Sequence, residues 1–164
     1  MSQGILRSIA AEMGSSAEIT SAGFLFHDRP ADSFAAETMK ERGIDLSEHR
    51  SRIVNRGMLE EADVVLTMTR EHVRDAALKN KDAFRKIFPI KEFARRATGV
   101  GRFEPGTDLD AWLTEVNGDR SPRLYLMDLQ ADKIDDPIGG SMSEFRECAD
   151  GLTLLCQTTA KLLF

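Results

Sequence analysis

EADVVLTMTREH, the sequence of residues 61–72, joins a short apolar run to the start of a helix. Residues 64–68 are apolar apart from one threonine, as a parallel strand buried on both faces requires. Helical spacing then returns in residues 70–80, through Val73 and Ala76. A buried strand followed at once by an amphipathic helix is typical of a parallel α/β sheet.

The same alternation continues on both sides of this stretch. The sequence predicts strands at residues 18–22, 64–68 and 86–90, and helices at residues 5–13, 32–43, 58–62, 70–80, 109–116 and 142–164. Residues 91–96 form a basic turn or helix, and the Gly-rich residues 98–107 form a loop. We expect one domain over residues 1–164, with an inserted loop and helix at about 97–130. The predicted fold class is α/β, a doubly wound parallel sheet with helices on both faces.

Composition excludes several classes of function. The chain has 164 residues, 41% of them hydrophobic, and 27 acidic against 22 basic side chains, a formal charge of −5. We therefore expect no nucleic-acid binding, which needs a basic footprint. No apolar run approaches the roughly 18 residues of a membrane span, and the first residues do not form a signal peptide, so we expect a cytoplasmic protein that binds no membrane.

The cysteines also indicate a cytoplasmic protein. Cys148 and Cys156 are the only cysteines and stand eight residues apart on the last helix, about two turns and too far for a disulfide. The sequence predicts two buried free thiols in a reducing compartment.

Two segments are candidates for a ligand site at the carboxyl ends of the strands, where parallel α/β folds bind ligands. The first is Gly4-Ile5-Leu6-Arg7-Ser8, where an arginine and a serine open a helix and can hold a phosphate. The second is the acidic turn at residues 135–140. Taken singly, Arg7 can be an ordinary surface side chain and Asp136-Pro137 an ordinary turn.

A series of motifs in order along the chain resembles the low molecular weight protein tyrosine phosphatase family. ILRSIAAE at residues 5–12 is similar to the end of the family motif Cys-x-Gly-Asn-x-Cys-Arg-Ser-Pro-Met-Ala-Glu. Four more motifs follow in register: TSAG at 20–23, RPAD at 29–32, GIDLSEHRSR at 43–52 and EADVVLTMTREH at 61–72, before the closing Asp136-Pro137. The resemblance covers most of the chain outside residues 97–130.

The resemblance implies a role for each matching residue. In the family, the thiolate of a Cys-x5-Arg loop attacks the phosphate, which the loop amides and the arginine hold while an aspartic acid protonates the leaving group. Carried over, Gly4, Ile5, Leu6, Arg7 and Ser8 bind the phosphate, with Ser8 also lowering the thiol pKa. The resemblance makes Asp136 the general acid and places His49 and Ser47 in support beneath the loop.

The chain departs from the family pattern at the nucleophile. The cysteine position falls on Met1, or on Ser2 if one loop residue is deleted, and Leu6 and Ile9 replace the second cysteine and the proline. The family's sheet order is 2-1-3-4, and its first strand, which precedes the cysteine, has no counterpart here. We therefore expect a chain truncated within its phosphate loop, which is inactive or nearly so.

The resemblance implies hydrolysis of phosphotyrosine for the family reaction. Ile5, two residues before the arginine, favours phosphotyrosine over phosphoarginine, which goes with threonine there. An alternative is a pseudophosphatase that binds phosphoproteins or inorganic phosphate without turnover. An arsenate reductase is disfavoured, because residues 69–100 contain no further cysteine. We expect no metal and no cofactor. Oligomeric state, natural substrate and pathway stay open.

Overall fold

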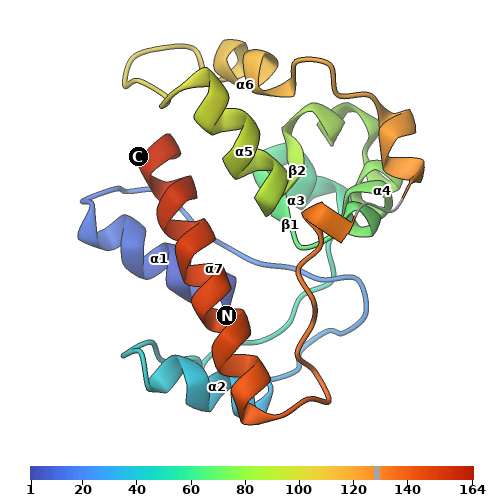
Figure 1. Ribbon diagram of the computed structural model, residues 1–164. Coiled ribbons are helices and arrows are strands. Elements are labelled where there is room, and N and C mark those ends of the chain that lie inside the picture. Colours follow the sequence, from blue (N-terminus) through green and yellow to red (C-terminus); the bar gives the residue numbers. More distant parts are fainter. Residues whose placement is uncertain (128–129) are drawn as a thin grey trace. The chain divides into compact units, whose positions relative to one another are not determined.

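Two short parallel strands form the sheet in the structure, a computed structural model that describes residues 1–127 and 130–164 (Figure 1). Strand β1 is Val65–Thr67 and strand β2 is Ile87–Pro89, with Val65 opposite Ile87. Helix α4, Arg70–Lys79, connects them, as the buried strand and the helical spacing after it predicted. The predicted α/β class with a parallel sheet is confirmed. Within the described residues the sheet has these two strands, so the order 2-1-3-4 is not seen there.

The chain divides into two compact units. The first comprises residues 1–54, 135–160 and 164, and the second comprises residues 55–134 and 161–163. The first contains α1 (Ser2–Glu12), α2 (Ser33–Lys40) and most of α7 (Met142–Leu163). Besides the sheet and α4, the second contains α3 (Arg56–Glu61), α5 (Ile90–Val100), α6 (Leu109–Asn117) and three 3-10 turns (Lys81–Lys86, Pro122–Leu126 and Gln130–Asp132).

The core of the second unit lies where β2 and α5 meet α6. Phe88 and Phe93 are fully buried, and their rings pack edge to face at 5.4 Å. Trp112 of α6 packs against Phe93 in the same way at 6.1 Å. Figure 1 shows α5 and α6 side by side, so the predicted amphipathic helix near residues 109–116 buries its apolar face here.

A buried charged cluster fixes the segment after α6. The Arg120 guanidinium lies 3.8 Å from the centroid of the Phe88 ring and donates to Tyr125 Oη at 2.6 Å. Tyr125 Oη in turn donates to Glu92 Oε2 at 2.5 Å, and Arg96 pairs with Glu92 at 2.8 Å. Burial raises the pKa of Tyr125, and the hydrogen bond to Glu92 adds to the rise, so this phenol stays protonated as a donor.

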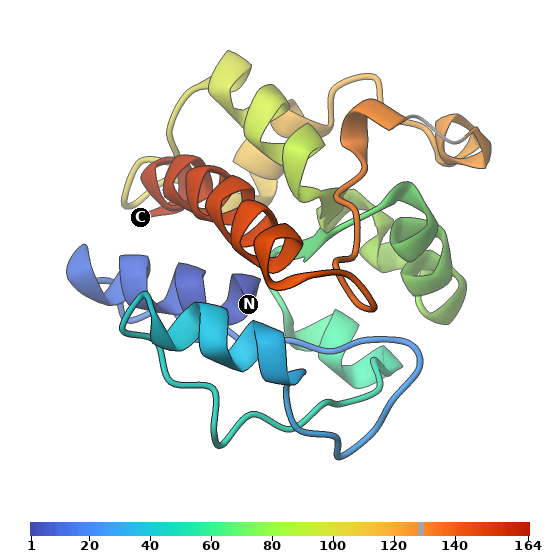
Figure 2. The same ribbon diagram turned by 60° about the horizontal axis from the view of Figure 1, so that its bottom comes forward.

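In the first unit, α1 and α2 lie beside α7 (Figure 2). Asp32 caps α2 by accepting from the amides of Phe34 and Ala35. Ser141 and Glu144 form a reciprocal capping box, so α7 begins at the predicted residue Met142. Two hydrogen bonds tie the elements together: Thr38 Oγ1 to Met142 Sδ at 3.4 Å, and Cys156 Sγ to the Ser2 carbonyl at 3.9 Å.

The predicted strand at residues 18–22 is wrong. These residues form no strand ladder, and pairing is limited to one parallel bridge between Gly23 and Ile53. The carbonyls of Ile19 and Ser21 accept from side chains instead of from the amides of a neighbouring strand. A strand exists only through hydrogen bonds with a neighbouring strand, so an extended segment does not become one by composition alone.

Several helix boundaries also differ from the prediction, and α2 ends at Lys40 rather than at residue 43. Helix α1 begins at Ser2 rather than near Ile5. Helix α5 continues through Gly99 to Val100, into the predicted loop, and ends at Gly101, whose φ is 107°. A buried face that includes Ala94 and Ala97 continues the helix past the weak helix former Gly99.

Candidate functional site

The start of α1 presents free backbone donors. The Ile5 amide donates to the Met1 carbonyl at 3.1 Å, so the amides of Ser2, Gln3 and Gly4 have no acceptor within the helix. These amides and the helix dipole favour an anion at this end of the helix. Gly4 lies against the loop that follows α2, because a Cβ at Gly4 would meet Ile44 Cγ2 at 2.9 Å.

Arg7 is exposed and is held by a main-chain oxygen. Its Nη2 donates to the Ile19 carbonyl at 2.5 Å, and Gln3 Nε2 donates to the same oxygen at 3.3 Å. Gln3 Oε1 also accepts from Ser21 Oγ at 2.5 Å. The guanidinium therefore lies on a neutral acceptor, a weaker partner than a phosphate would be.

The other residues expected at the phosphate lie within the helix. Ile5 is buried, Leu6 is half-buried, and Ser8 Oγ donates to Glu12 Oε1 at 3.4 Å. The sequence Ile-Leu-Arg-Ser-Ile-Ala-Ala lacks a proline and consists mostly of good helix formers, so residues 4–8 complete helical turns. As they stand, the amides from Ile5 onward are used by the helix and cannot contact a ligand.

His49 and Ser47 lie on the loop that follows Gly43. Asp45 fixes this loop by accepting from the Ser47 amide at 2.8 Å and from Ser47 Oγ at 3.0 Å. His49 is half-buried, and burial is the main cause that lowers its pKa. The positive charges of the Met1 amino group, Arg50 and Arg52 lower it further. His49 is thus neutral near pH 7 and lies close to the start of α1.

Asp136 lies in an exposed turn before α7. Its Oδ1 accepts from the Ile138 amide at 3.0 Å, the Asp-x-x turn that its sequence allows, and Gly139 has a φ of 84°. In the same unit, Cys148 Sγ lies 3.9 Å from the Asp135 carbonyl oxygen. Asp136 and Asp135 add to the rise in the pKa of Cys148, whose main cause is burial, while the Met1 amino group opposes it.

Charges at the predicted site residues act on one another only at a distance, and no side-chain hydrogen bond or ion pair joins these residues within the described part of the chain. The start of α1, His49 and Asp136 are linked through their electrostatic effects on one another or on Cys148. Arg7 points elsewhere, to Ile19. That Arg7 and Asp136 share one concavity stays a prediction. The contact of Cys156 with the Ser2 carbonyl was missed, because a helical face pattern on α7 says nothing about which element lies opposite.

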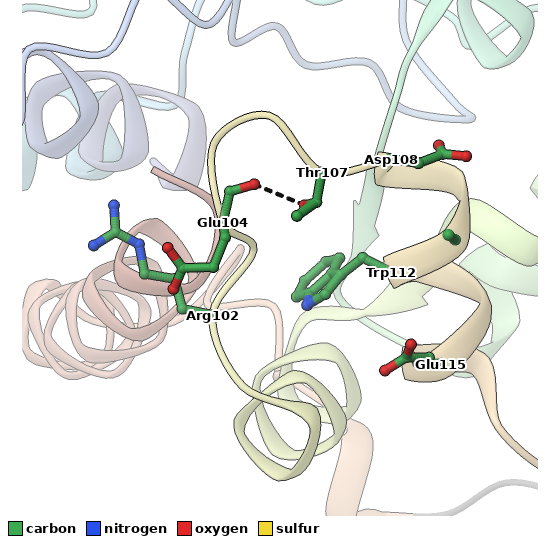
Figure 3. Close-up of a pocket in the computed structure, with 7 residues that line it drawn as sticks. Arg102, Glu104, Thr107, Asp108, Trp112 and Glu115 are labelled. Carbon is green, nitrogen blue, oxygen red and sulfur yellow. Dashed lines mark hydrogen bonds between the residues drawn. The ribbon is translucent and has the colours of Figure 1, made fainter.

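A pocket of about 190 Å³ lies in the second unit and contains none of the predicted site residues (Figure 3). Trp112 is one of the residues that line it, and the carboxylates of Glu104 and Glu115 lie on either side of the Trp112 side chain. In the described part of the chain, no group of three or more His, Cys, Asp or Glu side chains could hold a metal ion. No helix in that part is long and apolar enough to cross a membrane.

Comparisons with known proteins give consistent matches. A model of the family described as low molecular weight phosphotyrosine protein phosphatase matches residues 1–102. A protein-arginine-phosphatase of Bacillus subtilis (strain 168) is 27% identical over 164 residues, 99% of this chain and 87% of that protein. A solved mutant of YwlE from Bacillus subtilis matches with a TM-score of 0.71 at 25% identity, over 98% of this chain and 86% of that one. The solved low molecular weight protein tyrosine phosphatase of T. tengcongensis matches with a TM-score of 0.71 at 26% identity, over 96% of this chain and 86% of that one.

Proposed function

The chain belongs to the low molecular weight phosphotyrosine protein phosphatase family, and on that basis we propose that it recognises a phosphorylated side chain of a protein at the start of α1. In this proposal Arg7 leaves the Ile19 carbonyl and grips two phosphate oxygens, while the free amides of the first turn bind the third. Side chains of a helix lean toward its N-terminus, so the Arg7 side chain can reach that turn.

We also propose that these 164 residues bind the phosphorylated group without hydrolysing it. The protonation state of the two thiols supports this proposal. Phosphoryl transfer to sulfur needs a thiolate, and reactive cysteines have lowered pKa values. Cys148 and Cys156 are the only thiols in the sequence, and burial raises the pKa of both, that of Cys156 to about 11. At pH 7 about one Cys156 in ten thousand would be ionised.

Two finer points belong to the same proposal. Phosphotyrosine is the proposed ligand, because the residue two before the arginine is the aliphatic Ile5, although one relative is a protein-arginine-phosphatase. Asp136 is the proposed general acid of the family reaction, hydrolysis through a cysteinyl phosphate, in a form that carries a cysteine at position 1. Cys148 and Cys156 are both unpaired, which supports a reducing, cytoplasmic location.

Calorimetric titration tests the binding proposal directly. A phosphotyrosine peptide should bind, and the same peptide without phosphate should not. Arg7→Lys should weaken binding about tenfold or more, since an ammonium cannot form the two parallel bonds of a guanidinium. Arg56→Lys, a change at an exposed arginine of α3, is the matched control and should have no effect. Equal binding of the two peptides would show that phosphate is not recognised.

A further inference from the structure

Two segments of the first unit are joined into one surface. The Asp28 amide donates to the Ser51 carbonyl and the Ser51 amide to the Arg29 carbonyl, each at 2.8 Å. The Gly23 amide donates to the Arg52 carbonyl, also at 2.8 Å. These bonds hold residues 24–29 beside residues 50–53. We name their exposed side chains the arginine face: Leu25, Phe26, Arg29, Arg50, Arg52 and Ile53.

The arginines of this face have no acidic partner. Arg29 lies over the Phe26 ring, 5.2 Å from its centroid, Arg50 donates to the carbonyls of Ser47 and His49, and Arg52 donates to the Ser21 carbonyl. Among residues 1–127 and 130–164, no carboxylate forms an ion pair with any of the three. By contrast, a carboxylate pairs with each of nine other arginines: Arg42, Arg56, Arg70, Arg74, Arg85, Arg95, Arg96, Arg120 and Arg146.

Charge and apolar exposure coincide here. Leu25 is 78% exposed, Phe26 53% and Ile53 41%, although each is large and apolar. Exposed aromatic and aliphatic side chains beside arginines are typical of protein interfaces. Asp28 and Glu48 are exposed on or beside the same segments, so this surface carries three positive and two negative side chains. The three unpaired guanidiniums nevertheless leave strong donors for a ligand's carboxylates.

We propose that the arginine face docks an acidic segment of a protein partner, anchored by one or two apolar side chains of that segment. The inference rests on the proposed function in one respect, that the partner is the phosphorylated protein bound at the start of α1. Carboxylates of the segment pair with Arg29, Arg50 and Arg52, and its apolar side chains cover Leu25 and Phe26. The docked segment would raise the local concentration of the phosphorylated group at α1.

Fluorescence anisotropy with a labelled, unphosphorylated peptide tests the docking. The peptide carries a Leu-Phe pair flanked by Asp and Glu, and a second peptide has Lys at those flanking positions. The acidic peptide should bind, the lysine peptide should not, and added salt should weaken the binding. Arg29→Gln with Arg50→Gln should weaken it about tenfold. Phe26→Ser should also weaken it. None of these changes removes a hydrogen bond between the two segments.

Controls separate this proposal from the previous one. Arg56→Gln with Arg85→Gln makes the same change in net charge on the second unit and should leave the affinity within about twofold. Arg7→Met should abolish phosphotyrosine binding and leave acidic-peptide binding intact, because this peptide has no phosphate. Equal binding of the lysine peptide, equal loss in the control pair, or tighter binding of a single-stranded oligonucleotide through Arg29 and Arg50 would overturn the docking proposal.

Discussion

At the scale of single residues, the start of α1 lies among groups whose protonation the fold controls. Burial makes the neutral form of His49 and the protonated forms of both cysteines more stable than they are in water. A phosphatase of this family needs an ionised thiol beside its arginine. Burial instead raises the pKa of both thiols present, and this contrast can be measured.

Alkylation of the cysteines by iodoacetamide should be slow at pH 7. Raising the pKa of Cys156 from 9.0 to about 11 lowers the thiolate fraction about 100-fold, and burial also blocks the reagent. Mass spectrometry of time points, read against a free cysteine peptide, gives the rate for each thiol. Rapid labelling of Cys148 at pH 7 would reveal an activated nucleophile and would undermine the proposed lack of turnover.

His49 should make the fold less stable in mild acid. Its pKa in the folded chain lies below the ordinary value of 6.5, so the unfolded chain binds more protons in that window. The contribution of neutral His49 to the free energy of unfolding is therefore fully present above pH 6.5. It is lost as the pH drops from there through the pKa of His49 in the folded chain. Urea unfolding at about pH 7.5 and pH 5.5 measures this loss, which His49→Gln should reduce and His27→Gln should preserve. An unchanged loss in His49→Gln would assign it to other groups.

At the scale of elements, a buried carboxylate connects two helices of the second unit. Asp132 is 1% exposed and pairs with Arg70 of α4 at 2.8 Å and with Arg95 of α5 at 3.0 Å. Arg70 is 92% buried by the same measure and has no other carboxylate partner among the described residues. In such an arrangement, each charge offsets the free-energy cost of burying the other, so removing one partner leaves the other charge buried without compensation.

Asp132→Ala should therefore lower the free energy of unfolding by about 3–5 kcal/mol, because it leaves the Arg70 charge buried and unpaired. Arg85→Ala is the comparison, since its pair with Asp110 is 3.5 Å long and both side chains are 67% exposed. It should cost about 0–1 kcal/mol. Chemical denaturation of the three proteins gives both differences. A cost below about 1 kcal/mol for Asp132→Ala would mean that water reaches Arg70.

The elements that sequence reasoning predicted correctly are those whose signal is local. The apolar runs at β1 and β2 and the start of α7 at Met142 each depend on residues close in sequence. The segment at residues 18–22 failed because a strand depends on a partner far away in sequence. The start of α1 failed for a related reason. The resemblance implied a loop there, whereas the helix formers after Gly4 let the helix continue back to Ser2.

At the scale of the whole molecule, sequence predicted the family and the α/β class but not the arrangement of the site. Five motifs in register identified the family that the family model confirms over residues 1–102. The predicted roles of Arg7, Ser8 and Asp136 came with the resemblance and stay predictions. The contacts of Arg7 with Ile19 and of Cys156 with Ser2 follow from packing between distant segments, which a single sequence does not encode in any local pattern.

Turnover of a chromogenic aryl phosphate tests the central claim most directly. The 164-residue chain is assayed beside a form preceded by an apolar strand, with Met1→Cys completing a Cys-x5-Arg loop. We predict no burst and negligible turnover by the 164 residues, hydrolysis by the extended form, and its loss on Arg7→Lys in that form. Asp136→Asn should slow the extended form while leaving its affinity for substrate nearly unchanged. Robust hydrolysis by the unmodified 164 residues would contradict the account, since it would require an activated nucleophile, which neither the half-buried Cys148 nor the buried Cys156 is proposed to be.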